Sequence, residues 1–328
     1  MLRIRRILVP TDFSESADSV LPVAARLAQH HGAEVYLLHA VPEWEPDSWF
    51  ELHDCTDRQE VRRVLHRRAE VHLAYRVAHL PVPAQPYVSV SKGRPSSAIV
   101  SYAEEHGINL IVMATHGHRG FRHYRLGSVT EAVLRQSTCP VLTVRQDSTD
   151  LPAVTALETI LVPIDFSWYS RLALSYAKAF AADHGASVQL LHVINETTCP
   201  DFYLVQSQLA DRDRHGLELE AEKRLRHLLA EVGGPAVEAR VFVRSGSPAG
   251  EIVRFARAAG SDLILIAGHG LGGLLRMMLG SVTSHVVRAA PCSVLVTRWS
   301  PGMTPSSASL STHYWGLQPP AGTVEVVP

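Results

Sequence analysis

Short apolar runs alternate along the chain with longer stretches in which polar and apolar residues are mixed. Two of the runs, at residues 109–114 (Asn-Leu-Ile-Val-Met-Ala) and 262–267 (Asp-Leu-Ile-Leu-Ile-Ala), are apolar almost throughout instead of alternating. Strands of this kind are covered on both faces, as in a parallel sheet with helices on each side. The pattern therefore predicts an α/β fold.

The first part of the chain predicts five strands and four helices. The strands are expected at 4–10, 34–40, 85–90, 109–114 and 140–145, and the helices at 14–31, 57–80, 95–107 and 127–136. Because parallel strands are joined by right-handed crossovers, these elements predict a doubly wound, mostly parallel sheet.

The pattern repeats with a constant offset of 153 residues. The segment 7–14 (Ile-Leu-Val-Pro-Thr-Asp-Phe-Ser) recurs at 160–167 (Ile-Leu-Val-Pro-Ile-Asp-Phe-Ser), since 160 − 7 = 153. The segment 127–130 (Gly-Ser-Val-Thr) recurs unchanged at 280–283, by the same shift. A period of this length is a whole domain, so the chain is a tandem duplication of one fold.

The composition changes after each copy. Small and polar residues with Pro152 follow the first copy, and Ser, Thr, Pro and Gly dominate after Arg298. We predict one domain at 1–145, a linker at 146–157, a second domain at 158–298 and an irregular tail at 299–328.

The overall composition narrows the function classes. The chain has 328 residues, of which 46% are hydrophobic, and its basic (31) and acidic (32) residues nearly cancel. No overall field therefore favours nucleic acid or an anionic membrane. No segment has the roughly 18 consecutive apolar residues of a membrane helix, and the apolar stretch after the basic N-terminus is too short for a signal peptide. We expect a cytoplasmic protein.

Metal binding has little support in the sequence. The four cysteines lie far apart, with no CxxC pair. The close sets of histidines are His30-His31 and His116-Gly117-His118, and no third and fourth ligand stands at a recognisable spacing. The sequence predicts no metal site.

Ligands of doubly wound sheets bind beyond the carboxyl ends of the strands, where the strand order reverses. Asp12 and Asp165 follow the first strand of each copy. Two interpretations stay open: these residues and the serines two positions later cap the next helix, or the carboxylate also accepts a hydrogen bond from a ligand hydroxyl or amine.

A second polar segment follows the fourth strand of each copy. The first copy reads Ala114-Thr115-His116-Gly117, nine residues, then Gly127-Ser128, and the second reads Ala267-Gly268-His269-Gly270, nine residues, then Gly280-Ser281. Glycines let backbone amides approach a ligand, and a helix that begins at the serine favours an anion. This pattern predicts a phosphate site; the alternative is a serine that merely caps the helix.

The run from Gly268 to Gly273 also satisfies GxGxxG, which could indicate a dinucleotide site. It follows the fourth strand instead of the first, and no acidic residue after it in the domain could hold a ribose. A Walker A lysine and a GxSxG elbow are missing too. A nicotinamide-dependent oxidoreductase is the least favoured interpretation.

As a set, these motifs resemble the universal stress protein family, and the resemblance covers residues 1–145 and 158–298. It implies two tandem five-stranded, flavodoxin-like domains that pair through their last strands, residues 141–144 and 294–297, as a pseudo-dimer. One branch of the family binds ATP through Gly-x2-Gly-x9-Gly-Ser/Thr; here alanine (Ala114, Ala267) replaces the first glycine. The resemblance also implies contacts of Asp12 and Asp165 with adenosine.

We therefore expect a stress-response protein that binds ATP, with Mg²⁺ as a companion of the phosphates, in one or both copies. Sensing or regulation is expected, with at most slow hydrolysis; the alternative is a scaffold of the same fold with empty sites. A homodimer and an unidentified protein partner stay open. The candidate site residues are Pro10, Thr11, Asp12, Ala40, Ala114, His116, Gly117, Gly127, Ser128, Val129 and Thr130, and Pro163, Ile164, Asp165, Val193, Ala267, His269, Gly270, Gly280, Ser281, Val282 and Thr283.

Overall fold

The computed structural model describes residues 4–42, 58–91, 94–115, 126–145, 157–195, 210–269 and 279–298. The elements of the first half are β1 (Arg6–Pro10), α1 (Glu15–Asp18), α2 (Leu21–His31), β2 (Glu34–Pro42), α4 (Arg58–Ala78), β3 (Ala84–Ser91), α5 (Pro95–Glu105), β4 (Leu110–Ala114), α6 (Ser128–Gln136) and β5 (Val141–Val144). Those of the second half are β6 (Thr159–Pro163), α7 (Trp168–His184), β7 (Ser187–Ile194), α9 (Ala210–Glu231), β8 (Ala239–Ser245), α10 (Pro248–Ala259), β9 (Leu263–Ala267), α11 (Ser281–Ala289) and β10 (Ser293–Thr297).

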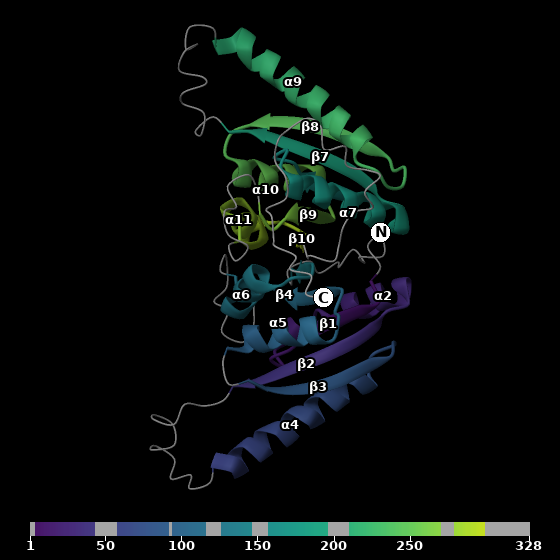
Figure 1. The fold of residues 1–328 in the computed structure, drawn as a ribbon, viewed down its shortest axis with the longest axis vertical. Helices are drawn as coiled ribbons and strands as arrows, with labels where there is room; N and C mark the ends of the chain where they lie inside the picture. Colours follow the sequence, from purple (N-terminus) through teal and green to yellow (C-terminus); the bar gives the residue numbers. More distant parts are fainter. Residues whose placement is uncertain are drawn as a thin grey trace, which may run out of the picture.

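All these strands form one continuous ten-stranded sheet, in the order β3-β2-β1-β4-β5-β10-β9-β6-β7-β8 (Figure 1). Neighbouring strands within each half are parallel, and β5 and β10 alone pair antiparallel where the halves meet. The predicted α/β fold and the predicted pairing through the last strand of each copy are confirmed.

The register of the β5–β10 pair reveals a pseudo-twofold axis. Leu142 lies opposite Leu295, and these two residues are equivalent, since 295 − 142 = 153. The equivalent residues Val141 and Val294 lie opposite Val296 and Thr143, respectively. The axis therefore passes between the two leucines, and equivalent positions near it face each other across the junction.

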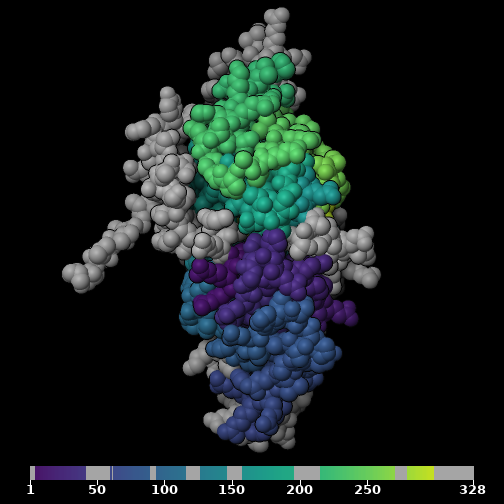
Figure 2. Space-filling model, turned by 90° about the vertical axis from the view of Figure 1, so that its right-hand side faces the viewer, coloured from purple at the N-terminus to yellow at the C-terminus, as the bar shows by residue number. Residues whose placement is uncertain are grey.

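Helices cover both faces of the sheet, as the uninterrupted apolar strands predict. One buried cluster joins the strands to side chains of α2, α4, α7 and α9, and a second joins the other face to α5, α6, α10 and α11. Each cluster contains residues of both halves, so the core continues across the junction. Figure 1 shows α4 and α9 at the two ends of the molecule, and Figure 2 shows its elongated shape, with the two halves in contact at the middle.

One predicted helix is wrong in the first copy. The expected helix 14–31 is interrupted between α1 and α2, whereas its counterpart α7 runs without a break. Pro22 explains the difference, because proline lacks an amide hydrogen and its ring clashes with the carbonyl four residues earlier, at Asp18. The equivalent residue of the second copy is Ser175, which has neither effect.

The ends of the predicted domains are described only in part. Leu157, the last residue of the predicted linker, is buried and packs in the core with β6. The rest of the linker and the tail at 299–328 lie outside the described residues.

Candidate functional site

The structure places both predicted segments of each copy at one edge of the sheet. β1 pairs in parallel with β2 on one side and with β4 on the other, so the strand order reverses between β1 and β4. β6 has the same position between β7 and β9. The residues after β1 and after β4 therefore flank the switch point of the first half, and those after β6 and β9 flank that of the second.

Asp12 supports the residue that caps the following helix. Asp12 Oδ1 accepts hydrogen bonds from the Ser14 amide at 3.0 Å and the Ser14 hydroxyl at 2.5 Å. Ser14 Oγ in turn accepts from the Ala17 amide at 3.2 Å and caps α1. In the second half, Ser167 donates to Asp165 in the same way, at 3.0 and 2.6 Å. The capping interpretation is thus correct for the serine, and each aspartate positions it.

The residue after each aspartate has an unusual backbone conformation. Phe13 and Phe166 have φ angles of 65° and 63°, in the left-handed region that costs a side-chain-bearing residue about 1–2 kcal/mol. Their rings pack on two histidines of the neighbouring strands: the centroids of Phe13 and His39 are 4.2 Å apart, and those of Phe166 and His192 are 4.6 Å apart. Both copies retain this strained turn, so it is part of how the switch point is built.

The same histidines tie the first two strands of each copy together. The Nδ1 atom of His39 lies 2.8 Å from the Thr11 carbonyl, and that of His192 lies 2.7 Å from the Ile164 carbonyl. A carbonyl only accepts, so Nδ1 carries the proton in both rings. Burial lowers the pKa of both histidines, which favours the neutral form. The sequence shows the Leu-Leu-His run of each copy but not this role.

Ala40 and Val193, the positions predicted beside the adenosine, lie on the strands next to these turns. Ala40 is near the end of β2 and Val193 near the end of β7, and both are partly exposed. The Thr11 amide donates to the Leu38 carbonyl at 2.8 Å, which holds the Pro10–Asp12 segment against β2. The structure therefore brings the predicted adenosine contacts together at one place in each half.

The glycine before each predicted phosphate helix uses its amide within the protein. The Gly127 amide donates to the Thr115 carbonyl at 2.8 Å, and the Gly280 amide donates to the Gly268 carbonyl at 2.9 Å. These bonds join the two ends of each loop. The expectation that the glycine amides hold phosphate is therefore corrected, because both already have an acceptor.

The threonines of the Gly-Ser-Val-Thr segments are also structural. Thr130 Oγ1 donates to the Ala114 carbonyl at 3.0 Å, and Thr283 Oγ1 donates to the Ala267 carbonyl at 2.8 Å. Each bond fixes the start of the helix to the end of the fourth strand of its copy. Three further candidates, His116, Gly117 and Gly270, lie outside the described residues.

The amides that could receive an anion belong to the first turns of α6 and α11. The helices begin at Ser128 and Ser281, and the N-caps are Gly127 and Gly280, so the interpretation of the serines as caps is wrong. A glycine cap offers no side-chain acceptor. The amides at 128–130 and 281–283 precede the first helical hydrogen bond, and they favour a negative charge.

Arg298 gives the second half a feature that the sequence analysis missed. It follows β10, and its side chain lies so close to Gly268 that a Cβ there would be 3.1 Å from guanidinium atoms. Arg298 is only 4% exposed, and Nε and Nη2 have no hydrogen-bond partner in the described part of the chain. Nη1 lies 3.2 Å from His269 Nδ1. Burial lowers the pKa of Arg298 to about 10, and burial followed by this arginine lowers that of His269 to about 4.

The equivalent arginine of the first half has a different role. Arg145 occupies the same position after β5, since 298 − 145 = 153, but its Nη1 donates across the junction to the Ala290 carbonyl at the end of α11. The two arginines occupy equivalent positions of the repeat, so the offset of 153 residues could have identified them as a candidate pair in the sequence. Only the structure shows that they point in different directions.

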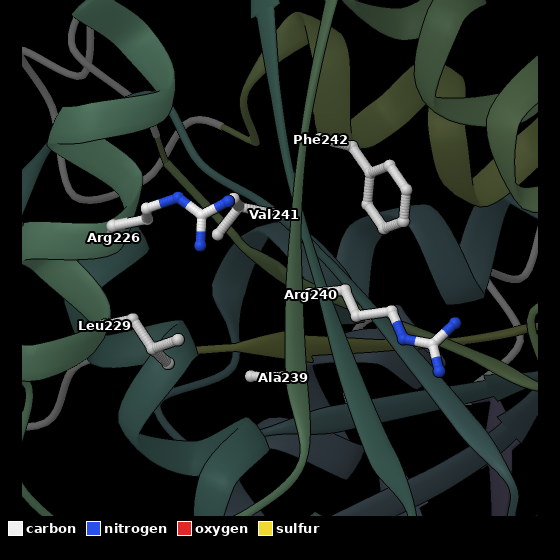
Figure 3. A pocket seen from close by; sticks show the side chains of 6 residues that line it. All are labelled: Arg226, Leu229, Ala239, Arg240, Val241 and Phe242. Atoms are coloured by element: carbon white, nitrogen blue, oxygen red, sulfur yellow. The ribbon is translucent and has the colours of Figure 1, made fainter. Parts of the chain in front are cut away.

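A surface hollow of about 510 Å³ lies elsewhere, at the edge strand β8. Figure 3 shows that its lining side chains come from both faces of this strand, with Val241 and Arg226 on one side and Phe242 and Arg240 on the other. Successive side chains of a strand point to opposite faces of the sheet. The hollow therefore extends around the exposed edge of β8 and does not form a pocket that could enclose a ligand. It is no candidate for a nucleotide site.

Within the described helices, none has both the length and the apolar character needed to cross a membrane.

Comparisons with known proteins agree with the duplication. The model of the universal stress protein family matches residues 3–145 and 156–298. A universal stress protein of Mycobacterium tuberculosis is 26% identical over 304 residues, or 90% of this chain and 97% of that protein. The universal stress protein YxiE of Bacillus subtilis is 31% identical over 144 residues, 42% of this chain and 97% of its own. The crystal structure of a universal stress protein from Archaeoglobus fulgidus, 23% identical, covers 91% of this chain and 100% of that one with a TM-score of 0.58, which supports the fold alone.

Proposed function

Because the chain belongs to the universal stress protein family, with one match to the family in each half, we propose that it is a stress-response protein that binds ATP at the crevice of the second half. The observation that carries the proposal is the buried guanidinium of Arg298 beside the loop that leads to α11. Arg298 contacts His269, and no ion pair of its guanidinium is found among the described residues. A buried charge without an opposite charge is strongly destabilising, and phosphate is one of the anions that a guanidinium binds through paired hydrogen bonds.

The chemistry around Arg298 suits a phosphate. Gly268 contacts the guanidinium, and its carbonyl accepts from Gly280, the N-cap of α11. Gly268 thus links the arginine to a helix N-terminus that has no side-chain cap. A phosphate bound here would receive hydrogen bonds from Arg298 and from the first-turn amides of the helix, and Mg²⁺ bound with it would balance further negative charge.

The adenosine would lie toward β6 and β7. Asp165 holds the turn through its hydrogen bonds with Ser167. A carboxylate oxygen can accept more than one hydrogen bond, so we infer that a ribose hydroxyl binds at this group. Val193 offers apolar contact at the neighbouring strand end. No nucleophile or acid–base pair is assigned, so we infer sensing or regulation, not rapid turnover.

The test is calorimetric titration of the full chain with Mg-ATP. Replacement of Arg298 by methionine keeps the aliphatic stem and removes the donors. A hydrogen bond to a charged group contributes about 1.5–3 kcal/mol, so R298M is expected to weaken binding by at least about tenfold.

R145M is the matched control, because it removes the equivalent arginine, whose hydrogen bond lies at the C-terminal end of α11 and not at the N-terminus that faces the second crevice. It is expected to leave the affinity for Mg-ATP unchanged. If the unaltered protein shows no heat of binding and carries no nucleotide through purification, it is a scaffold of this fold instead. If R298M binds Mg-ATP as tightly as the unaltered protein, Arg298 does not contact the phosphates.

A further inference from the structure

Three histidines from the two halves meet beside the pseudo-twofold axis. His30 and His31 end α2, and His184 ends α7. Each helix stops at a glycine in the left-handed conformation, Gly32 with φ 62° and Gly185 with φ 72°. Because 184 − 31 = 153, His31 and His184 are equivalent residues, and the axis that relates the halves brings them face to face. Figure 1 shows α2 and α7 next to each other at the junction.

The three rings are in direct contact. The centroids of His30 and His184 are 4.3 Å apart, in a stacked arrangement, and those of His30 and His31 are 4.9 Å apart. One ring nitrogen from each residue can be chosen so that all three lie within 4.8 Å of one another. In a tetrahedral zinc site with Zn–N bonds of about 2.0–2.1 Å, ligand nitrogens are about 3.3 Å apart. Binding of the ion would therefore bring the nitrogens closer together and turn the stacked rings of His30 and His184 so that their lone pairs converge.

Two of the ring nitrogens are buried without a hydrogen bond. His31 Nε2 and His184 Nε2 have no partner among the residues that the structure describes. His184 Nδ1 lies 2.9 Å from the Phe180 carbonyl and must donate to it, so Nε2 of the neutral ring carries an unshared electron pair. An unsatisfied buried polar group costs about 1–3 kcal/mol, and its presence calls for an explanation.

The surroundings match those of metal-binding histidines. Such histidines usually donate their second ring nitrogen to a carbonyl or carboxylate, as His184 does to Phe180. The rings of His31 and His184 are both partly buried, and His184, whose Nδ1 donates to Phe180, presents Nε2 as a possible ligand atom. Asp183 is close enough to interact electrostatically with both rings, but its carboxylate is not among the ligand atoms that lie within 4.8 Å of one another.

We propose that His30, His31 and His184 form a zinc site that joins the two halves of the chain across the pseudo-twofold axis. Three imidazoles suit Zn²⁺, and a water molecule completes the tetrahedron. The sequence analysis noted the pair His30-His31 but predicted no metal site, because the third ligand lies 153 residues from the second. The ion stabilises the pairing of the halves, since it binds the folded arrangement and not the unfolded chain.

The experiment uses the full chain, stripped of metal by a chelator and exchanged into metal-free buffer. Zn²⁺ is titrated in competition with a chromophoric chelator, and the melting temperature is measured with and without Zn²⁺. We expect one tight Zn²⁺ per chain and a higher melting temperature with the ion present. Replacement of Zn²⁺ by Co²⁺ is expected to give the strong visible absorption of tetrahedral coordination.

H30Q is the main variant, because His30 is exposed and its replacement leaves the core intact. It is expected to lower the affinity for Zn²⁺ at least about tenfold. Loss of a residue that merely hydrogen-bonds a metal ligand already lowers the affinity by about 10–100-fold, and loss of a ligand should cost no less. H184Q is expected to do the same. H285Q, at an exposed position of α11, is the control and is expected to bind like the unaltered protein.

Two results would overturn the proposal. One is the absence of a tight Zn²⁺ in the unaltered chain, in which case the rings only stack on one another. The other is tight binding that persists in both H30Q and H184Q, which would place the ion elsewhere among the 18 histidines of the chain.

Discussion

The two equivalent arginines give opposite predictions for the stability of the protein without nucleotide. Burial lowers the pKa of Arg298 from 12.5 to about 10, which corresponds to roughly 3 kcal/mol against the charged form in the folded state. Arg298 stays charged near neutral pH, so the folded protein bears this cost. Replacement by methionine removes the charge, keeps most of the buried volume, and is expected to raise the free energy of unfolding by up to about 3 kcal/mol.

R145M is expected to have the opposite effect. Arg145 donates to the carbonyl of Ala290, a residue that is 2% exposed, and loss of the donor leaves that carbonyl unsatisfied at a cost of about 1–3 kcal/mol. Scanning calorimetry of both variants without nucleotide is the assay; for domains of this size, 1 kcal/mol corresponds to about 2–4 °C in Tm. A lower Tm for R298M would refute the reasoning, because Arg298 would then be a structural residue and not one kept for an anion.

Two further predictions concern the strained turn of the second half. F166A is expected to be less stable than F166G by about 1–2 kcal/mol in chemical denaturation, because only glycine adopts the observed φ of 63° without strain; equal stabilities would mean that the backbone relaxes. Burial lowers the pKa of His192, which faces the Ile164 carbonyl, Asp165 and Arg224, so the unfolded chain binds more protons below about pH 6.5 and stability falls as the pH falls. H192N, whose side-chain amide nitrogen takes the place of Nδ1 and can still donate to Ile164, is expected to flatten the dependence of Tm on pH between about 7 and 5; an unchanged slope would contradict this.

Periodicity and the repeat predicted the fold well because both are read from many residues at once. The apolar run at 109–114 predicted a buried strand, and β4 occupies that place, because a strand covered on both faces needs apolar residues at every position. The constant offset predicted two copies of one fold, and the family resemblance implied that they pair through their last strands; Leu142 opposite Leu295 shows that they do. The predicted helix 14–31 failed because one residue, Pro22, outweighs the propensities of its neighbours.

The sequence predicted that the candidate segments follow the first and fourth strands of each copy, but it could not predict their hydrogen bonds. The position of a glycine does not show whether its amide faces a ligand or closes a loop, and the Gly127 amide closes one. An arginine after a strand is normally exposed, so the burial of Arg298 depends on tertiary packing that no local pattern records. The same applies to His184, which reaches His31 only because the pseudo-twofold axis passes nearby.

Fusion of two copies in one chain lets equivalent residues diverge, which the two separate chains of a symmetric dimer cannot do. Arg145 now stabilises the junction, whereas Arg298 lies buried at the second crevice. Within the described residues of the first half, the guanidinium that would bind phosphate in the second half therefore has no counterpart. This asymmetry predicts one tight ATP per chain, with any binding to the first half weaker.

The stoichiometry of Mg-ATP binding tests this divergence directly. We expect about one tight site per chain in calorimetry, because charge-assisted hydrogen bonds from Arg298, each contributing about 1.5–3 kcal/mol, are lacking in the first half. Mutation of either aspartate distinguishes the halves: D165N is expected to weaken the tight site, whereas D12N, the matched change in the first half, leaves it intact. Two sites of equal affinity, or a tight site lost in D12N and kept in D165N, would show that the buried arginine does not decide which half binds.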